Sequence, residues 1–455
     1  MAEIVPFRGV LYNSGKVGEL RGVMAPPYDV ISPGKQDELY TRHPNNIVRL
    51  ILGKSGPEDT EESNRYSRAA ADLKEWMDSG VLTKDQRPAI YYYKQTFSLP
   101  GGGKQTRKGF IARSRLEEFG KGIRPHEKTL SGPKADRLKL MQACKVNLSC
   151  IFSLYSSPRL EINTALDNAT AGLEPIIDVV DDDGIENILW RVDDPEIIAL
   201  VTESMKSKAL FIADGHHRYE TALNYRNMMR EREANPTGDE PYNYVMMYFS
   251  NMDDEGMTIW PTHRVIHSLK DFDGAAFLAE CGRYFDIEEF PCAGADEAGA
   301  RARFLERLVS VGEEKTSLGL HVKGVDVYYL LTIKSKDVMD EVFGDTIPEV
   351  FKGLDVTVLH SLVFSRILGL TQEAQERQEN LIYVKSSAEA LSAMKDEKNQ
   401  LVFLLNATKI EQVKAVAEAG FVMPQKSTYF YPKLLSGLVI NQFGEESSEA
   451  EPAGA

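Results

Sequence analysis

The densest group of side chains that could do chemistry is the segment FIADGHHRYETAL, residues 211–223. An apolar run leads into Asp214 and Gly215, and helix-forming residues follow at once, which predicts a strand that ends where a helix begins. The first N–H groups of such a helix attract anions. Gly215 lets a ligand approach the backbone closely, and Arg218 can hold a phosphate with two parallel hydrogen bonds. The segment therefore predicts a binding site for an anionic, phosphorylated ligand.

The polar neighbours in this segment also have structural interpretations. Asp214 either caps the helix or serves as a metal ligand or general base. His216 and His217 are adjacent, so they point to different sides of the turn. We expect one of them to reach the substrate and the other to pack in the protein. The whole DGHHR cluster at a strand–helix junction is harder to explain by structure alone than any single member.

A second group of reactive side chains is RPHEKT, residues 124–129, in a loop rich in glycine and proline. A solvated surface loop is the structural alternative for such a charged run. General acid–base catalysis needs a carboxylate or imidazole within hydrogen-bond reach of the reacting proton. Glu127 and His126 are the candidates for that role, while Lys128 and Thr129 are candidates for phosphate binding.

Two further segments offer substrate contacts. Pro26 and Pro27 precede Tyr28 and Asp29 and favour an extended loop that presents the carboxylate. In QKSTYFYPK, residues 425–433, Lys426 and Ser427 could close one side of a pocket. Each segment also has a structural interpretation without substrate contact. Asp29 could simply be a carboxylate in a turn, and the aromatic residues of 425–433 could pack between domains. GGGK, residues 101–104, lacks the spacing of a phosphate loop and lies in a hairpin turn.

Composition limits the function further. The chain has 455 residues, which favours two domains, and 68 acidic against 53 basic residues give a net charge of −15. That balance argues against nucleic-acid binding, which needs basic patches. The four cysteines form no CxxC pair, so we expect free thiols in a reducing cytoplasm and no zinc site. No apolar run is long enough to span a bilayer, so a soluble cytoplasmic protein without membrane contact is predicted.

Both helices and strands are predicted to position the candidate site residues. Apolar periodicity predicts helices over 61–79, 134–147 and 216–233, and the alternating segments 89–99 and 106–117 predict a hairpin. YVMMYFSNM, residues 244–252, predicts a central strand. Residues 1–55 are expected to be short extended segments, with a strand at NIVRLILGK (46–54). The predicted domains are 1–270, with an inserted hairpin and the HEKT loop, and an α+β domain over 271–443, before a disordered acidic tail at 444–455.

The motifs APPYDVIS, RPHEKT, ADGHHRYETA and PQKSTYFYPKL resemble those of the prokaryotic family known as domain of unknown function 1015. The resemblance covers nearly the whole chain except the tail. The strand that ends in DGHHR also resembles the phosphate-binding motif of the ParB/sulfiredoxin superfamily, which includes kinases of free serine. That resemblance implies a mixed sheet-and-helix domain of α/β to α+β class, with a large insertion.

Carried over residue by residue, the resemblance implies that Gly215, His216, His217 and Arg218 hold phosphates and that Asp214 assists catalysis or metal binding. His216 stands where sulfiredoxin has a cysteine, which argues against sulfinic-acid reduction. The serine kinases have a catalytic Glu before DGHHR. Over 150 extra residues precede the motif here, so the assignment passes to Glu127, with Asp29 as second choice.

The leading hypothesis is therefore phosphoryl transfer from ATP or ADP, with Mg²⁺, to the hydroxyl of a small metabolite such as free L-serine. Alternatives are a nucleotide-binding regulatory protein without turnover and a phosphatase or nucleotide hydrolase. The expected partners are small-molecule substrates, and the one protein partner considered is a second copy of the chain in a homodimer.

Overall fold

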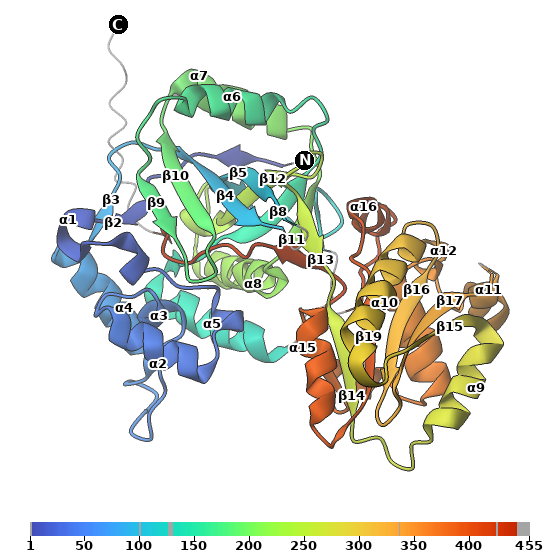
Figure 1. Ribbon diagram of the computed structural model, residues 1–455. Coiled ribbons are helices and arrows are strands. Elements are labelled where there is room, and N and C mark those ends of the chain that lie inside the picture. The colour runs from blue at the N-terminus through green and yellow to red at the C-terminus, as the bar shows by residue number, and fades with distance from the viewer. Residues whose placement is uncertain (1, 100–101, 126–130, 336, 425, 444–455) are drawn as a thin grey trace, which may run out of the picture. The chain divides into compact units, whose positions relative to one another are not determined.

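The computed structural model describes residues 2–99, 102–125, 131–335, 337–424 and 426–443. It divides into two compact units (Figure 1). Unit 1 holds the chain up to Thr258 and again from Pro432, and unit 2 holds Ile259–Tyr431. The predicted second domain spans 271–443. The chain instead returns to unit 1 at Pro432, because the apolar segment after it is buried there and Ile440 exchanges two backbone hydrogen bonds with Val10.

Unit 1 is built on a nine-stranded mixed sheet in the order β6-β11-β8-β12-β5-β4-β10-β9, with β1 paired to β5. β12 (Tyr244–Asn251) is central and buried along its whole length, as its apolar run predicts. β8 (Ile151–Tyr155) runs parallel to β12, and β5 (Lys104–Arg115) forms the predicted hairpin with β4 (Ile90–Ser98). The other strands are β1 (Ile4–Val5), β6 (Ile123–Arg124), β9 (Ile177–Val180), β10 (Glu186–Val192) and β11 (Leu210–Asp214). Two-stranded pairs are formed by β2 (Val10–Tyr12) with β3 (Leu82–Lys84) and by β7 (Val146–Asn147) with β21 (Asn441–Gln442).

Helices surround this sheet. α5 (Ser131–Cys144) packs between α4 (Arg65–Asp78) and α8 (His216–Arg232), while α6 (Glu161–Thr170) and α7 (Pro195–Met205) lie together along one side (Figure 1). The three helices predicted at 61–79, 134–147 and 216–233 are confirmed as α4, α5 and α8. The short α1 spans Ser14–Val17.

The prediction of extended structure over residues 1–55 is wrong in two places. α2 (Pro33–Arg42) begins where Ser32 accepts a hydrogen bond from Lys35 N and proline occupies the first helical position, a start signal that outweighs the turn-like composition. NIVRLILGK forms the helical turn α3 (Val48–Ile51) instead of a strand, because the Asn46 side chain accepts the Val48 N–H.

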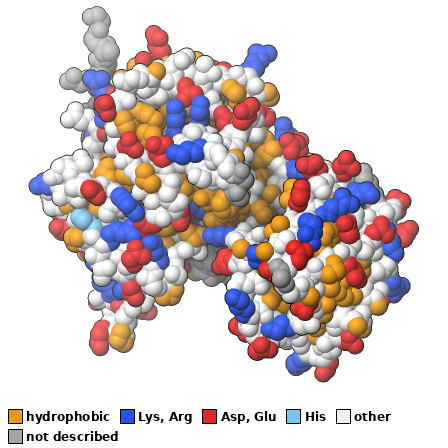
Figure 2. Space-filling model, in the orientation of Figure 1, with side chains coloured by type: hydrophobic (Ala, Val, Ile, Leu, Met, Phe, Trp, Pro, Cys, Tyr) orange, Lys and Arg blue, Asp and Glu red, His pale blue; other side chains and the backbone are white. Residues whose placement is uncertain are grey.

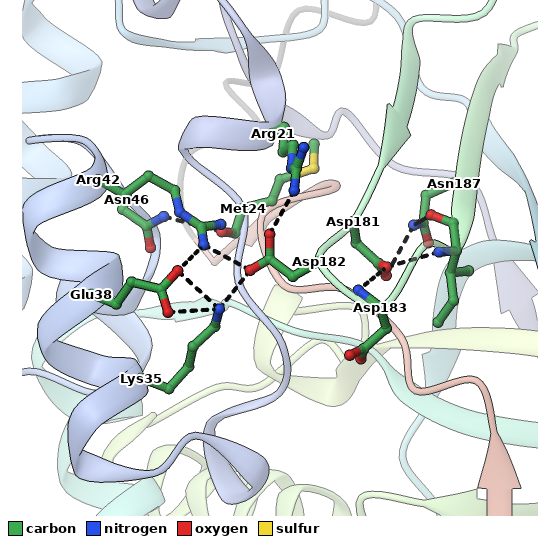
Figure 3. Close-up of polar contacts among 11 residues, drawn as sticks. Arg21, Met24, Lys35, Glu38, Arg42, Asn46, Asp181, Asp182, Asp183 and Asn187 are labelled. Carbon is green, nitrogen blue, oxygen red and sulfur yellow. Dashed lines mark hydrogen bonds and ion pairs between the residues drawn. The ribbon is translucent and has the colours of Figure 1, made fainter.

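An ion cluster fixes the segment that precedes the APPYD loop (Figure 3). Asp182, in the turn between β9 and β10, pairs with Arg21 at 3.0 Å, Lys35 at 2.6 Å and Arg42 at 2.7 Å. These three cations hold the pKa of Asp182 well below its usual range although burial opposes them. Next to the cluster, Asn46 Nδ2 donates to the carbonyl of Met24 at 3.0 Å. The loop that carries Tyr28 and Asp29 is thus tied down at its start.

Unit 2 is an antiparallel six-stranded sheet with helices, in the order β15-β17-β16-β19-β14-β18. The strands are β14 (His263–His267), β15 (Phe285–Pro291), β16 (Ser317–Val322), β17 (Val327–Ile333), β18 (Leu381–Val384) and β19 (Asn399–Leu405). The helices are α9 (Gly274–Tyr284), α10 (Glu297–Gly312), α11 (Val338–Phe343), α12 (Glu349–Lys352), α13 (Asp355–Thr357), α14 (Gln372–Glu376), α15 (Ser387–Ser392) and α16 (Ile410–Glu418). α13 continues into a π-helix at Val358–Ile367, and β13 (Thr258–Trp260) pairs with β20 (Tyr429–Tyr431). The predicted mixture of sheets and helices is confirmed in both units.

The surface carries both signs of charge. On the face drawn in Figure 2, Lys and Arg side chains are interspersed with Asp and Glu side chains over both units. Within the described part of the chain, no helix has the length and apolar character needed to cross a membrane.

Candidate functional site

The strand-to-helix junction predicted at DGHHR is confirmed. β11 ends at Asp214, and α8 begins at His216. Between them Gly215 is the N-cap residue with φ 91° and ψ 27°, a left-handed conformation that glycine adopts without strain. The first turn of α8, which the structure describes in full, has no acidic residue. The positive end of the helix dipole therefore meets the end of the strand without a carboxylate in that turn.

Asp214 does not cap the helix, so that interpretation of it is wrong. It lies one residue before the N-cap position, and its carboxylate accepts a hydrogen bond from Arg218 Nη2 at 2.7 Å and another from Lys433 Nζ. Burial favours the neutral acid, but Lys433 and Arg218 outweigh it and hold the pKa of Asp214 well below its usual range. Asp214 is thus a largely buried carboxylate, with a side chain 19% exposed, that two cations share.

Arg218 is held by three protein acceptors. Besides Asp214, its Nη1 donates to the Ser149 hydroxyl at 3.2 Å and to the carbonyl of Cys150. Burial raises the pKa of the Cys150 thiol to about 12 although Arg218 opposes the shift, so this sulfur stays protonated at neutral pH. The guanidinium predicted to hold phosphate therefore rests on the protein, close to the helix N-terminus.

A third positive charge lies deeper in unit 1. Arg107 on β5 is fully buried, and its Nη2 donates to Gln95 and, at 2.6 Å, to the carbonyl of Pro432. Its Nε and Nη1 have no hydrogen-bond partner among the residues that the structure describes. Burial lowers the pKa of Arg107, and Asp214 is near enough to oppose that shift. Arg107, Arg218 and Lys433 together bring three positive charges to one carboxylate.

The APPYD loop reaches the same place. The Arg137 guanidinium lies 4.1 Å from the centre of the Tyr28 ring. Burial raises the pKa of Tyr28, and the neighbouring charges that act on it include Arg218, Arg137, Asp29 and Asp214. Asp29 itself is exposed at the start of the short 3₁₀ turn Tyr28–Val30.

A small cavity of about 10 Å³ remains between these groups. Pro27, Ser149, Asp214, Arg218 and Lys433 are among its lining residues. That is room for about one water molecule. In Figure 1 the red segment after β20 runs beside β11 and α8, and it is this segment that supplies Lys433. A phosphate needs more room, so Arg218 and Lys433 would have to turn away from Asp214 to admit one.

The other predicted residues fall in different places. His216 is buried and close enough to help lower the pKa of Asp214, while His217 is half-buried in the first turn of α8. Lys426 and Ser427 belong to unit 2, where the Ser427 hydroxyl donates to the Pro424 carbonyl at 2.6 Å and lines a cavity of about 720 Å³. His126, Glu127, Lys128 and Thr129 lie outside the described residues, so their roles stay predictions.

Sequence reasoning missed Lys433, Arg107, Ser149 and Tyr28 as parts of this site. Lys433 and Tyr28 lie in two of the recognised motifs, PQKSTYFYPKL and APPYDVIS, beside the residues that were predicted to bind the substrate. Arg107 and Ser149 carry no local signal, because only the tertiary fold brings them to the end of β11.

The site offers one carboxylate to a metal ion. Among the described residues, no three His, Cys, Asp or Glu side chains come together as a metal site. Mg²⁺ that bridges phosphates needs only one or two protein carboxylates, because waters and phosphate oxygens complete its shell. Asp214 fits such a single-ligand role once Lys433 moves away from it.

The close approach of Arg218 to Gly215 gives a first prediction. A Cβ on Gly215 would lie 2.9 Å from Arg218 Nε, in a left-handed backbone. We expect Gly215→Ala to lower the free energy of unfolding by about 2–3 kcal/mol, since strain and a displaced ion pair add. Gly172→Ala is the control, with φ +73° and open space around its Cβ, and should cost about 1 kcal/mol. Equal losses in urea denaturation would show that the contact with Arg218 is unimportant.

No curated protein matches the chain. Among solved structures, a conserved hypothetical protein from Pyrococcus furiosus has 12% identity and a TM-score of 0.31, with 68% of this chain and 87% of that chain covered. A free serine kinase variant in complex with ADP has 10% identity and a TM-score of 0.32, with 68% and 84% covered. SbnI with a C-terminal truncation, from Staphylococcus aureus, has 8% identity and a TM-score of 0.30, with 69% and 82% covered.

A family model confirms the resemblance over residues 4–357, which include the APPYD loop, the RPHEKT segment and the DGHHR junction. PQKSTYFYPKL, residues 424–434, lies outside that match. The chain therefore belongs to the family described as protein of unknown function (DUF1015).

Proposed function

We propose that the site at the N-terminus of α8 binds the phosphates of ATP or ADP, and that the protein transfers a phosphoryl group to the hydroxyl of a small metabolite, free L-serine. The observation that carries this proposal is the charge of the site. Arg218 and Lys433 both pair with the single carboxylate of Asp214 at the positive end of a helix, and the charge of the buried Arg107 acts on the same carboxylate. An excess of buried positive charge is favourable when an anion binds beside it.

Each residue then has a definite task. Arg218 and Lys433 exchange the Asp214 carboxylate for phosphate oxygens, and the space beside the Gly215 backbone that Arg218 now fills becomes available to the phosphate. His216, Lys128 and Thr129 are further proposed phosphate ligands, and His217 is a proposed catalytic residue. Once Arg218 and Lys433 have turned away from it, the Asp214 carboxylate is available as a metal ligand or hydrogen-bond acceptor. Bound Mg²⁺ would neutralise charge on the phosphates, with Asp214 as its protein ligand.

The proposed general base is Glu127, with His126 beside it in the sequence. A carboxylate that accepts the hydroxyl proton is what phosphoryl transfer to an alcohol requires. Asp29, Lys426 and Ser427 are the proposed contacts to the acceptor molecule.

The decisive experiment is incubation of the protein with Mg²⁺, serine and either ATP or ADP, followed by ³¹P NMR for phosphoserine. Glu127→Gln should bind nucleotide as the wild type does, by calorimetry, and form no product. The absence of phosphoserine with both donors would refute the serine kinase. Nucleotide binding without chemistry would instead favour a regulatory protein, and phosphate release without an acceptor a hydrolase.

Lys433 provides a test of the phosphate site itself. Loss of one charged hydrogen bond to phosphate predicts that Lys433→Met weakens nucleotide binding by about tenfold or more. Lys208→Met is a matched control. The exposed fractions of the two lysine side chains are 16% and 15%, and each is paired with a carboxylate. Lys208 lies at the opposite end of β11, before Leu210, so its substitution should leave affinity unchanged. Equal effects in calorimetry would place the phosphates elsewhere.

A further inference from the structure

A second, separate cavity of about 270 Å³ lies in unit 2 beside the π-helix Val358–Ile367. Much of its wall is apolar and is formed by Ile347, Pro348, Phe351, Val422 and Met423. Polar side chains from the helical segments complete it, among them Thr357, His360 and Gln375. A mostly apolar wall with a few polar groups is the usual composition of a small-molecule site, and this one is slightly smaller than drug-sized pockets.

His360 is held in one tautomer. The side-chain amide of Gln375 donates from Nε2 to the Leu370 carbonyl at 2.9 Å and to the Ser365 hydroxyl at 3.0 Å, which fixes its orientation. Gln375 Oε1 therefore faces His360 Nδ1 at 2.8 Å, so Nδ1 carries the proton and donates. The other ring nitrogen, Nε2, then carries a lone pair and can only accept a hydrogen bond. Burial, followed by the charge of Arg264, lowers the pKa of His360 to about 3, so the ring is neutral at physiological pH.

Two buried polar atoms of residues that line this cavity lack partners. His360 is 9% exposed, and neither its Nε2 nor Thr357 Oγ1 has a hydrogen-bond partner among the described residues. A buried polar atom without a partner costs roughly 1–3 kcal/mol, so natural proteins keep few of them. Both atoms belong to residues that line the same cavity.

The backbone beside His360 is also unusual. The segment Val358–Ile367 is a π-helix, in which Leu368 N donates to the Val363 carbonyl five residues back, at 2.9 Å. The Ser365 hydroxyl adds a bond to the His360 carbonyl at 3.1 Å. π-Helical turns are rare and often occur at functional sites.

We propose that this cavity binds a small, neutral and mostly apolar molecule that carries a hydroxyl or N–H group, and that His360 Nε2 accepts the hydrogen bond from that group. A neutral acceptor and an apolar wall disfavour a charged ligand, because Glu376, the charged residue among those that line the cavity, is itself exposed to solvent. Thr357 Oγ1 is the second polar contact. This site is independent of the phosphate site of unit 1.

Phenol and toluene are matched probes, since they have nearly the same size and differ in one hydroxyl donor. In the full-length protein with ¹⁵N-labelled histidine, phenol should move the Nε2 resonance of His360, identified by its absence in His360→Gln. The dissociation constant of phenol should also be at least about fivefold lower than that of toluene, which is the difference that one hydrogen bond produces. An unmoved Nε2 resonance at saturating phenol, or equal affinity for the two probes, would overturn the proposal.

A filling variant tests the cavity without touching His360. Val422 is half-buried on the wall, and Val422→Trp should abolish phenol binding while the protein stays folded. Val309→Trp is the control, because Val309 is 59% exposed on α10, away from the lining residues. Unchanged phenol binding in Val422→Trp would equally overturn the assignment of the cavity.

Discussion

Asp214→Asn is expected to lower the free energy of unfolding by about 3–5 kcal/mol, because the amide leaves Arg218 and Lys433, whose side chains are only 13% and 16% exposed, without their shared counter-charge. The pKa of Asp214 is held below its usual range, so its contribution is present above the unfolded pKa of about 3.9 and is lost as pH falls through the folded pKa. Urea denaturation at pH 7 measures the loss. On acidification the variant should lose less stability than the wild type.

The same variant should acquire a dependence on anions. With the carboxylate gone, phosphate or sulfate can pair with Arg218 and Lys433, so 50 mM phosphate should return about 1–2 kcal/mol of the lost stability. Asp167→Asn is the matched control, since Asp167 also bridges two cations, Lys94 at 2.7 Å and Lys108 at 2.8 Å. It should be destabilised without rescue by anions. Equal rescue of the two variants would contradict an anion site at the start of α8.

The junction that forms the site could be predicted because its causes are local. An apolar strand, a glycine and a run of helix formers follow one another within 211–223, and β11, Gly215 and α8 appear there. The ion pair that occupies the site could not be predicted in this way. Asp214 and Lys433 are 219 residues apart, and the chain passes through unit 2 between them.

Buried charge is a second reason why parts of the site could not be predicted from the sequence. Arg107 lies on a strand of the predicted hairpin, and the alternation that predicts such a strand gives no sign that an arginine on it is fully buried. Similarly, the sequence allows the Asp214 carboxylate either to cap the helix or to pair with a cation far away in the chain. The tertiary fold brings Lys433 to it, and a charged group taken out of water needs such a partner.

Asp355→Asn is expected to stabilise unit 2 at pH 8. Asp355, at the start of α13, lines the cavity of about 720 Å³, and its two oxygens accept bonds from Ser317 N and Asn406 Nδ2, each at 3.3 Å. Burial raises its pKa to about 7. Between about pH 4 and 7 the folded state therefore holds a proton that the unfolded state has lost, and stability falls as pH rises.

The amide cannot ionise, so the variant should exceed the wild type by about 2–4 kcal/mol at pH 8 and lose that advantage near pH 4. Urea denaturation at both pH values, followed by the fluorescence of Trp260 in unit 2, measures the difference. Asp345→Asn, an exposed aspartate of the same unit, should change stability little at either pH. Only a group that changes charge between pH 4 and pH 8 can make the difference in unfolding free energy between variant and wild type depend on pH. If Asp355→Asn has the same advantage at both pH values, titration of the buried carboxyl is not its cause, and a change in hydrogen bonding is.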